Sequence, residues 1–195
     1  LGEGLEEMDR IAAEVLDDSF RTALEGESRN FKESSSSLLF AFGLAILLIF
    51  LVMAAQFESF KDPFVIMFTV PLALFGALLF MWIFGITLNI YSQIGIIMLI
   101  GLVAKNGILI VEFANQRQNA GLNKNQAIVE ASIQRLRPIL MTSISTILGL
   151  LPLALASGEG ANGRIAMGTA VIGGLLISTM LTLFLIAAMY IYLST

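Results

Sequence analysis

The lysine at position 105 is the residue of this sequence whose surroundings point most directly to chemistry. No Asp, Glu, Lys or Arg occurs between positions 63 and 104, and six uncharged residues follow Lys105. If this stretch crosses a membrane, placing a lysine at its centre costs about 2.5 to 3.5 kcal/mol on insertion scales, and such residues mark ion pathways and proton relays. The alternative is a lysine whose flexible stem carries its charge to the membrane surface.

A buried cation requires a counter-ion, and the residues around Lys105 do not supply one. Glu112 lies seven residues further on and shares a helical face with Lys105, but two helical turns separate these residues by about 10 Å. The other acidic residues after position 36 are expected at or beyond the membrane surfaces: Glu58, Asp62, Glu130 and Glu159. We therefore expect the partner carboxylate to come from another segment of a longer chain or from another subunit.

A polar stripe lies further along the sequence and could face Lys105. Arg135, Thr142 and Thr146 stand at i, i+7 and i+11, which is one face of a helix. Threonines in membrane helices more often bond to their own backbone than carry protons, so each hydroxyl alone indicates structure. The stripe suggests a role in proton transfer because it begins at an arginine.

The composition describes the elements that must hold these residues. Of 195 residues, 57% are hydrophobic and 13% are charged, whereas soluble domains carry about a quarter charged residues. This argues against a soluble enzyme, a nucleic-acid binder or a disordered tail. The chain contains no Cys and no His, so thiolate and imidazole sites are excluded, and we expect no metal and no cofactor.

Five apolar segments meet or approach the roughly 20 residues that a membrane-spanning helix needs. They are expected at about 35–55, 64–84, 90–113, 138–156 and 165–193. Between the third and fourth, Asn123 and Gln126 match a capping box, and an amphipathic helix is expected at about 124–136. The predicted fold class is an all-α polytopic membrane protein, with residues 34–195 as its transmembrane domain.

The basic residues of the loops predict the orientation of these spans. Placing the N-terminal head outside puts five basic residues in the cytoplasm and leaves Arg164 in an outward loop; the five are Lys61, Arg117, Lys124, Arg135 and Arg137. We therefore expect a non-cytoplasmic head and a cytoplasmic C-terminus.

The head, residues 1–33, differs from the rest of the chain in charge. Residues 1–36 contain ten acidic and four basic side chains, a net charge of −6. Its first part shows an amphipathic helical pattern, and residues 20–25 are typical of a short strand. One helix and one strand cannot bury a sizeable core, so we expect an α+β remnant of a larger extramembrane domain.

Small residues at helical spacing predict where the spans touch, because close backbone approach requires them. The third span has Gly95, Gly101 and Gly107, and the fifth has Ala170, Gly174 and Ser178 within a four-residue repeat. We expect these two helices to lie inside a bundle.

Several sequence runs resemble the resistance-nodulation-division (RND) superfamily, in its hydrophobe/amphiphile efflux branch of acriflavine-resistance-type multidrug pumps. The runs are AAQFESF at 54–60, VPLAL at 70–74, GLVAKNGILIVEF at 101–113, RLRPILMTS at 135–143 and GTAVIGG at 168–174. Members of this family have twelve spans in two similar halves. The resemblance therefore implies a C-terminal fragment that contains the last five spans, with the end of the periplasmic porter domain as its head.

The resemblance also implies a function and partners. Such proteins are secondary active transporters and not enzymes: they exchange protons for hydrophobic or amphiphilic compounds across the bacterial inner membrane. They form homotrimers with a periplasmic adaptor and an outer-membrane channel, and here the first half of the transporter would complete the chain. No nucleic acid is expected as a partner.

The proton relay implied by the resemblance consists of Lys105 and Asn106 on one helix and Arg135 and Thr142 on the next. Two aspartates from the missing first half would face Lys105, release it when they take up protons, and so shift the helices. Two other interpretations stay open. A non-transporting membrane scaffold or assembly subunit also needs five packed spans, and a protein- or lipid-export relative shares the bundle.

Overall fold

A computed structural model describes residues 2–17, 19–20 and 22–193 of the chain. It contains seven helices in these residues: α1 (Gly2–Val15), α2 (Glu27–Phe57), α3 (Lys61–Met67), α4 (Thr69–Ile83), α5 (Ile90–Asn119), α6 (Lys124–Ala154) and α7 (Ala161–Leu193). The chain divides into two compact units, Leu1–Ala41 and Phe42–Thr195, and α2 begins in the first unit and ends in the second.

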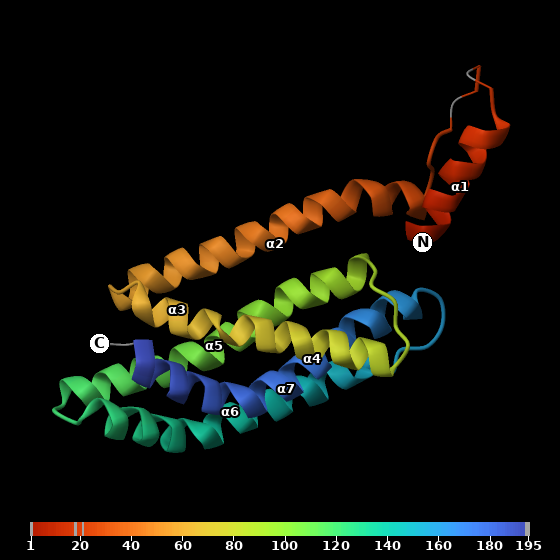
Figure 1. The fold of residues 1–195 in the computed structure, drawn as a ribbon. Coiled ribbons are helices and arrows are strands. Elements are labelled where there is room, and N and C mark those ends of the chain that lie inside the picture. Colours follow the sequence, from red (N-terminus) through yellow and green to blue (C-terminus); the bar gives the residue numbers. More distant parts are fainter. Residues whose placement is uncertain (1, 18, 21, 194–195) are drawn as a thin grey trace. The chain divides into compact units, whose positions relative to one another are not determined.

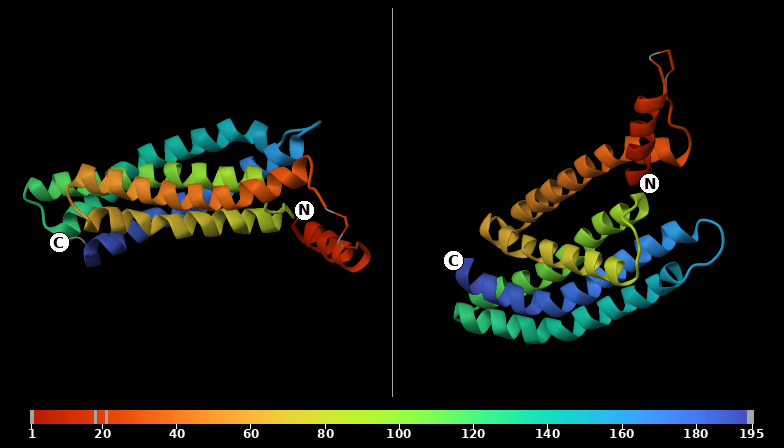
Figure 2. Two further views of the ribbon diagram at one scale, coloured as in Figure 1. Left: turned by 90° about the horizontal axis from the view of Figure 1, so that it is seen from above. Right: turned by 45° about the vertical axis from the view of Figure 1, so that its right-hand side comes forward.

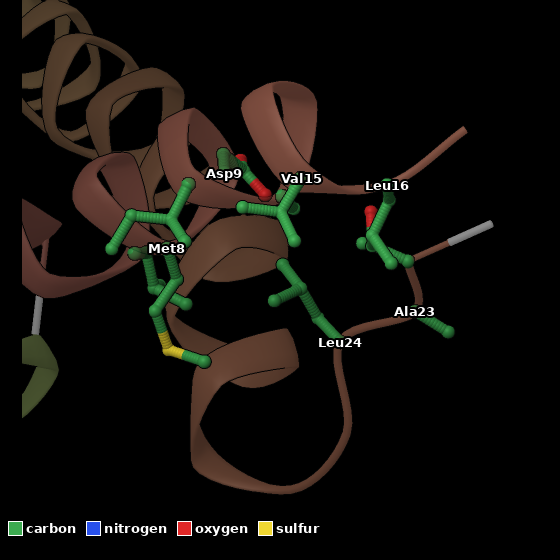
Figure 3. Close-up of a pocket in the computed structure, with 10 residues that line it drawn as sticks. Met8, Asp9, Val15, Leu16, Ala23 and Leu24 are labelled. Carbon is green, nitrogen blue, oxygen red and sulfur yellow. The ribbon is translucent and has the colours of Figure 1, made fainter. Parts of the chain in front are cut away.

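The first unit contains α1, an irregular segment and the start of α2. Apolar residues of α1 and of residues 22–24 line a pocket of about 480 Å³, in which Asp9 is the acidic side chain (Figure 3). The predicted strand at 20–25 is not formed in the described residues: residues 20 and 22–25 are irregular, and residue 21 lies outside the description. A strand needs a neighbouring strand to satisfy its backbone, and the described part of this unit contains none.

In the second unit, α7 is the central helix, and α4, α5 and α6 pack against it (Figure 1). The right view of Figure 2 shows α7 running alongside α4 and α6. Five helical stretches among the described residues are long and apolar enough to cross a membrane, which confirms the predicted number of spans. More than half of the best window in α5 and in α7 is buried, against 11% in α6 and 6% in Phe40–Phe57. The chain alone therefore leaves much of α2 and α6 uncovered.

The second span is interrupted, whereas the sequence pattern suggested one helix at 64–84. α3 ends at Met67, and α4 begins at Thr69. Pro71 has no N–H group to donate to the carbonyl of Met67 four residues earlier, which explains the break at this point. The Thr69 hydroxyl donates instead to the carbonyl of Ile66 at 2.7 Å and stabilises the junction.

The fourth span and the predicted amphipathic helix form one continuous helix, α6, which contains both Pro138 and Pro152. Asn123 is its N-cap residue, but the Asn123 side chain makes no capping hydrogen bond. A capping box stands at the start of α5 instead. There Asn89 accepts from the backbone of Ser92 at 2.8 Å, and the Ser92 hydroxyl accepts from the backbone of Asn89 at 2.9 Å.

Glycines allow α4, α5 and α7 to approach closely. A Cβ atom at Gly76 of α4 would lie 2.9 Å from both the Gly173 carbonyl oxygen and Ile177 Cβ of α7. The small residues singled out in the sequence have different surroundings: Ala170 and Ser178 are buried, Gly95 faces Met167, Gly107 faces Ile66 and Ile186, and Gly174 faces Leu99. Gly101 has open space around it in this chain.

Candidate functional site

Lys105 lies near the middle of α5 on a face that the chain leaves uncovered. Its side chain is exposed, as are Ile94, Met98 and Gly101, which precede it at spacings of three and four residues. A helix places residues at this spacing on one face. No hydrogen bond or ion pair joins Lys105 to another residue within the described part of the chain. The apolar helix α5 thus has one ammonium group, that of Lys105, on its exposed face.

Asn106 lies on a different side of α5 from Lys105. It is 6% exposed, and successive residues of a helix point about 100° apart. Asn106 therefore faces the interior of the bundle, while Lys105 faces outward. The structure does not bring these two predicted relay residues together on one surface.

Arg135 contacts α5 near its C-terminal end through the ring of Phe113. The guanidinium carbon of Arg135 lies 4.8 Å from the ring centroid, and that of Arg117 lies 4.9 Å from the same centroid. Arg117 also forms an ion pair with Glu130 at 3.1 Å. The Nε atoms of both arginines are buried without an acceptor among the described residues. Cation–π contacts and one carboxylate thus hold Arg135 and Arg117 next to each other.

Thr142 and Thr146 hydrogen-bond to their own helix. The Thr142 hydroxyl donates to the carbonyl of Ile139 at 3.0 Å, and the Thr146 hydroxyl donates to the carbonyl of Thr142 at 2.8 Å. These are the back-bonds that hydroxyl side chains commonly make within helices. No hydrogen bond or ion pair joins Thr142 or Arg135 to Lys105 in the described residues. In this chain the four predicted relay residues form no direct network.

A buried polar network that the sequence did not reveal lies at the end of the bundle where α3 begins and α5 and α7 end. The Asn115 side-chain amide donates to an Asp62 carboxylate oxygen at 2.8 Å. The Tyr190 hydroxyl contacts the side-chain carbonyls of Asn115 and Gln118. Asp62 is 7% exposed and Tyr190 is 0% exposed. The sequence offered one weak signal: the apolar last turns of the fifth span contain two tyrosines, Tyr190 and Tyr192.

No group of three or more acidic residues suited to a metal ion occurs among the described residues, which also lack His and Cys. The site therefore consists of an isolated cation, two arginines stacked on an aromatic ring, and a buried carboxylate network.

Comparison with known proteins gives the family of the chain. A family model described as the AcrB/AcrD/AcrF family matches residues 1–194. The chain belongs to this family. The RND-type efflux resemblance found in the sequence is thereby confirmed.

Several individual proteins are similar to this chain over 90% or all of its length. An uncharacterized transporter of Haemophilus influenzae is 42% identical over 201 residues, which cover 100% of this chain and 20% of that protein. The toluene efflux pump membrane transporter TtgB of Pseudomonas putida is 40% identical over 194 residues, which cover 100% of this chain and 18% of TtgB. The multidrug resistance protein MdtC of Erwinia tasmaniensis is 40% identical over 176 residues, which cover 90% of this chain and 17% of MdtC. The chain spans about a fifth of the length of these relatives.

Proposed function

We propose that the chain is the C-terminal membrane part of a proton-driven exporter of hydrophobic or amphiphilic compounds. The observation that carries this proposal is Lys105, a lysine in an apolar helix on an uncovered face without an acidic partner in the described residues. Because an uncompensated charge at membrane depth is costly, the position is useful only if a partner supplies a carboxylate. The family membership makes transport the natural use of such a pair.

The uncovered face of α5 is where we place the first half of the transporter. The five spans correspond to the last five of twelve, and two intramembrane carboxylates of the first half pair with Lys105. The head is the end of a periplasmic porter domain. The complete protein acts as a homotrimer with a periplasmic adaptor and an outer-membrane channel. The length that the relatives have beyond this chain leaves room for these parts.

The mechanism is an exchange of ion pairs on α5. When both carboxylates are ionised, their charge holds the Lys105 ammonium group between them. Protons that reach the carboxylates from the periplasm remove this attraction, and the Lys105 side chain moves toward other acceptors. α5 then shifts against its neighbours, and this shift is coupled to substrate release. Arg135 and Thr142 guide the proton toward the cytoplasm once the Thr142 hydroxyl leaves the carbonyl of Ile139.

The names of the relatives support organic molecules as the transported compounds. TtgB is described as a toluene efflux pump and MdtC as a multidrug resistance protein. We extend this class of cargo, apolar or amphiphilic organic molecules, to the protein that contains the present chain.

Ethidium transport by the full-length parent in proteoliposomes tests this function. We expect ethidium, an amphiphilic fluorescent cation, to move across the membrane when a pH gradient is imposed, without ATP. The rate is expected to fall to the level of protein-free vesicles when the pH is equal on both sides. Transport that proceeds equally well without the gradient, or no transport of ethidium and of neutral amphiphilic dyes, would contradict the proposal.

The proposed orientation predicts which loops a membrane-impermeant maleimide can reach. The C-terminus and the loop between α5 and α6 are cytoplasmic, whereas the loop between α6 and α7 is periplasmic. In a cysteine-free parent, Asn162→Cys is expected to react from the periplasmic side and Asn125→Cys only after the membrane is opened. Both residues are exposed, so burial does not bias the comparison. The reverse labelling pattern would invert the proposed topology.

A further inference from the structure

The network of Asp62, Asn115 and Tyr190 contains a buried charge that the proposed relay does not use. Among the described residues, Asp62 is the charged side chain in the buried set, and the other polar members are neutral. A buried carboxylate is destabilising unless hydrogen bonds or a cation compensate it. Within the described residues, Asp62 has no cation partner, and its side-chain donor is the neutral amide of Asn115. Asp62 also lies in the first turn of α3, where the helix dipole favours a negative charge, and the Asn115 amide adds a directional contact to α5.

The chemistry of the three side chains determines which group donates and which accepts each hydrogen bond of the network. A carboxylate only accepts hydrogen bonds, so the Asn115 amide must turn its N–H toward Asp62. This orientation leaves the Asn115 carbonyl facing Tyr190, whose hydroxyl donates to it. Tyr190 has one hydroxyl proton and therefore donates to either Asn115 or Gln118 at a time, both of which lie within hydrogen-bonding distance. The hydrogen bonds of this network thus join α3, α5 and α7.

The apolar contacts beside this network do not fix the helices in the same way. Gly107 of α5 lies against Ile66 of α3 and Ile186 of α7, so the same three helices meet about two turns from Asn115. Apolar contacts are not directional, whereas hydrogen bonds require defined distances and angles. The close contact at Gly107 and the hydrogen bond of Asn115 therefore both restrict α5 at this end of the bundle, and the hydrogen bond adds a defined distance and angle to Asp62.

Asn115 and Lys105 belong to the same helix. Ten residues separate them, which is about 15 Å along the axis and about 80° around it. α5 contains no proline between these positions, so it transmits a shift from one to the other. A movement of α5 that starts at Lys105 therefore also displaces Asn115 relative to Asp62.

We propose that Asp62, Asn115 and Tyr190 form a latch that holds α5 in one of the two positions used in transport. This inference rests on the proposed function. Asp62 is a positioning residue in this latch: it acts on Lys105 through α5 and touches neither cargo nor the relay. The latch closes when the Asn115 amide bonds to Asp62, and it opens when α5 moves away from α3. Loss of the latch leaves substrate binding intact and slows the return of α5 to the position that the latch holds.

Ethidium transport by reconstituted full-length variants tests the latch, with rates normalised to correctly folded trimer. Asp62→Leu and Asn115→Leu are expected to lower the maximal rate at least fivefold and to change the half-saturating ethidium concentration less than twofold. Asp62→Asn is expected to keep at least half of the maximal rate, because its carbonyl still accepts from the Asn115 amide. The double variant of Asp62→Leu with Asn115→Leu is expected to be no slower than the slower single variant.

Each possible result separates the latch from its alternatives. A purely structural contact would lower the yield of folded trimer and leave the normalised rate unchanged, which would overturn the latch. Multiplying effects in the double variant, or loss of transport in Asp62→Asn, would also overturn it. Lys105→Ala serves as the internal reference. If Lys105→Ala transports normally, the proposed relay itself fails, whereas a dead Lys105→Ala beside a fully active Asp62→Leu contradicts the latch alone.

Discussion

Lys105→Ala is expected to reduce drug resistance of cells that carry the full-length parent to the level of cells without it. The variant removes the ammonium group that the proposed carboxylates hold, so proton uptake no longer changes the forces on α5. Alanine suits an apolar helix and removes a charge that costs about 2.5 to 3.5 kcal/mol on insertion, so insertion and abundance are expected to remain normal. Growth at increasing drug concentration and immunoblots of membrane fractions measure the two properties.

Two matched variants sharpen the result for Lys105. Lys124→Ala removes a lysine at the first turn of α6, outside the proposed relay, and is expected to keep full resistance. Lys105→Arg keeps the charge but replaces a compact ammonium group with a wider planar guanidinium group, and it is expected to fail in transport. A scaffold that needs only a cation for helix pairing would tolerate arginine. Normal resistance in Lys105→Ala would remove the basis of the relay.

Gly76→Ala is expected to destabilise the bundle by about 1 to 3 kcal/mol, the usual cost of overpacking a close contact. The added Cβ would lie 2.9 Å from the Gly173 carbonyl oxygen, 2.9 Å from Ile177 Cβ and 3.1 Å from Gly174 Cα. These atoms belong to the backbone of α7 or lie next to it, so no flexible side chain can move aside. α4 and α7 must therefore separate along their length. Thermal unfolding of the purified parent in detergent measures the effect.

Gly43→Ala is the matched control for this substitution. It lies in α2, and a Cβ at this position would meet nothing within 4 Å. Alanine in an open helical position is expected to stabilise by about 0.5 to 1 kcal/mol, because glycine loses more conformational freedom on folding. Opposite shifts in the unfolding midpoint are thus expected for the two glycines. Equal shifts would mean that the contact between α4 and α7 is looser than the structure shows.

The long helices were predictable because hydrophobicity over about 20 residues is a local property of the sequence. Their interruptions were less so. The pattern at 64–84 predicted one span, but α3 ends at Met67, whose carbonyl Pro71 leaves without a donor. Pro138 is typical of a helix start, yet it lies inside α6 because the preceding turns continue the helix. The pattern at 20–25 predicted a strand, but a strand needs a neighbouring strand, and the described part of the head contains none.

In the candidate site, too, features that depend on local sequence were predictable, and contacts between distant segments were not. Lys105 was recognisable from the sequence because a charge in a long apolar run is costly wherever the neighbouring helices lie. Asp62 was assigned to the membrane surface, since a corner beside Lys61 and Pro63 usually faces water. In the structure Asp62 is buried and hydrogen-bonded to Asn115, 53 residues away in sequence, and Tyr190 of α7 bonds to the same Asn115. Contacts between distant segments of this kind leave no periodic signal in a single sequence.

Proton flux through the reconstituted full-length parent tests the central claim most directly. A pH-sensitive dye trapped inside the vesicles reports proton movement when ethidium is added to the parent, to Lys105→Ala and to Lys105→Arg. The relay predicts ethidium-dependent flux in the parent and flux at the level of empty vesicles in both variants. Ethidium-dependent proton flux that persists unchanged in Lys105→Ala would contradict the claim that this lysine couples protons to export.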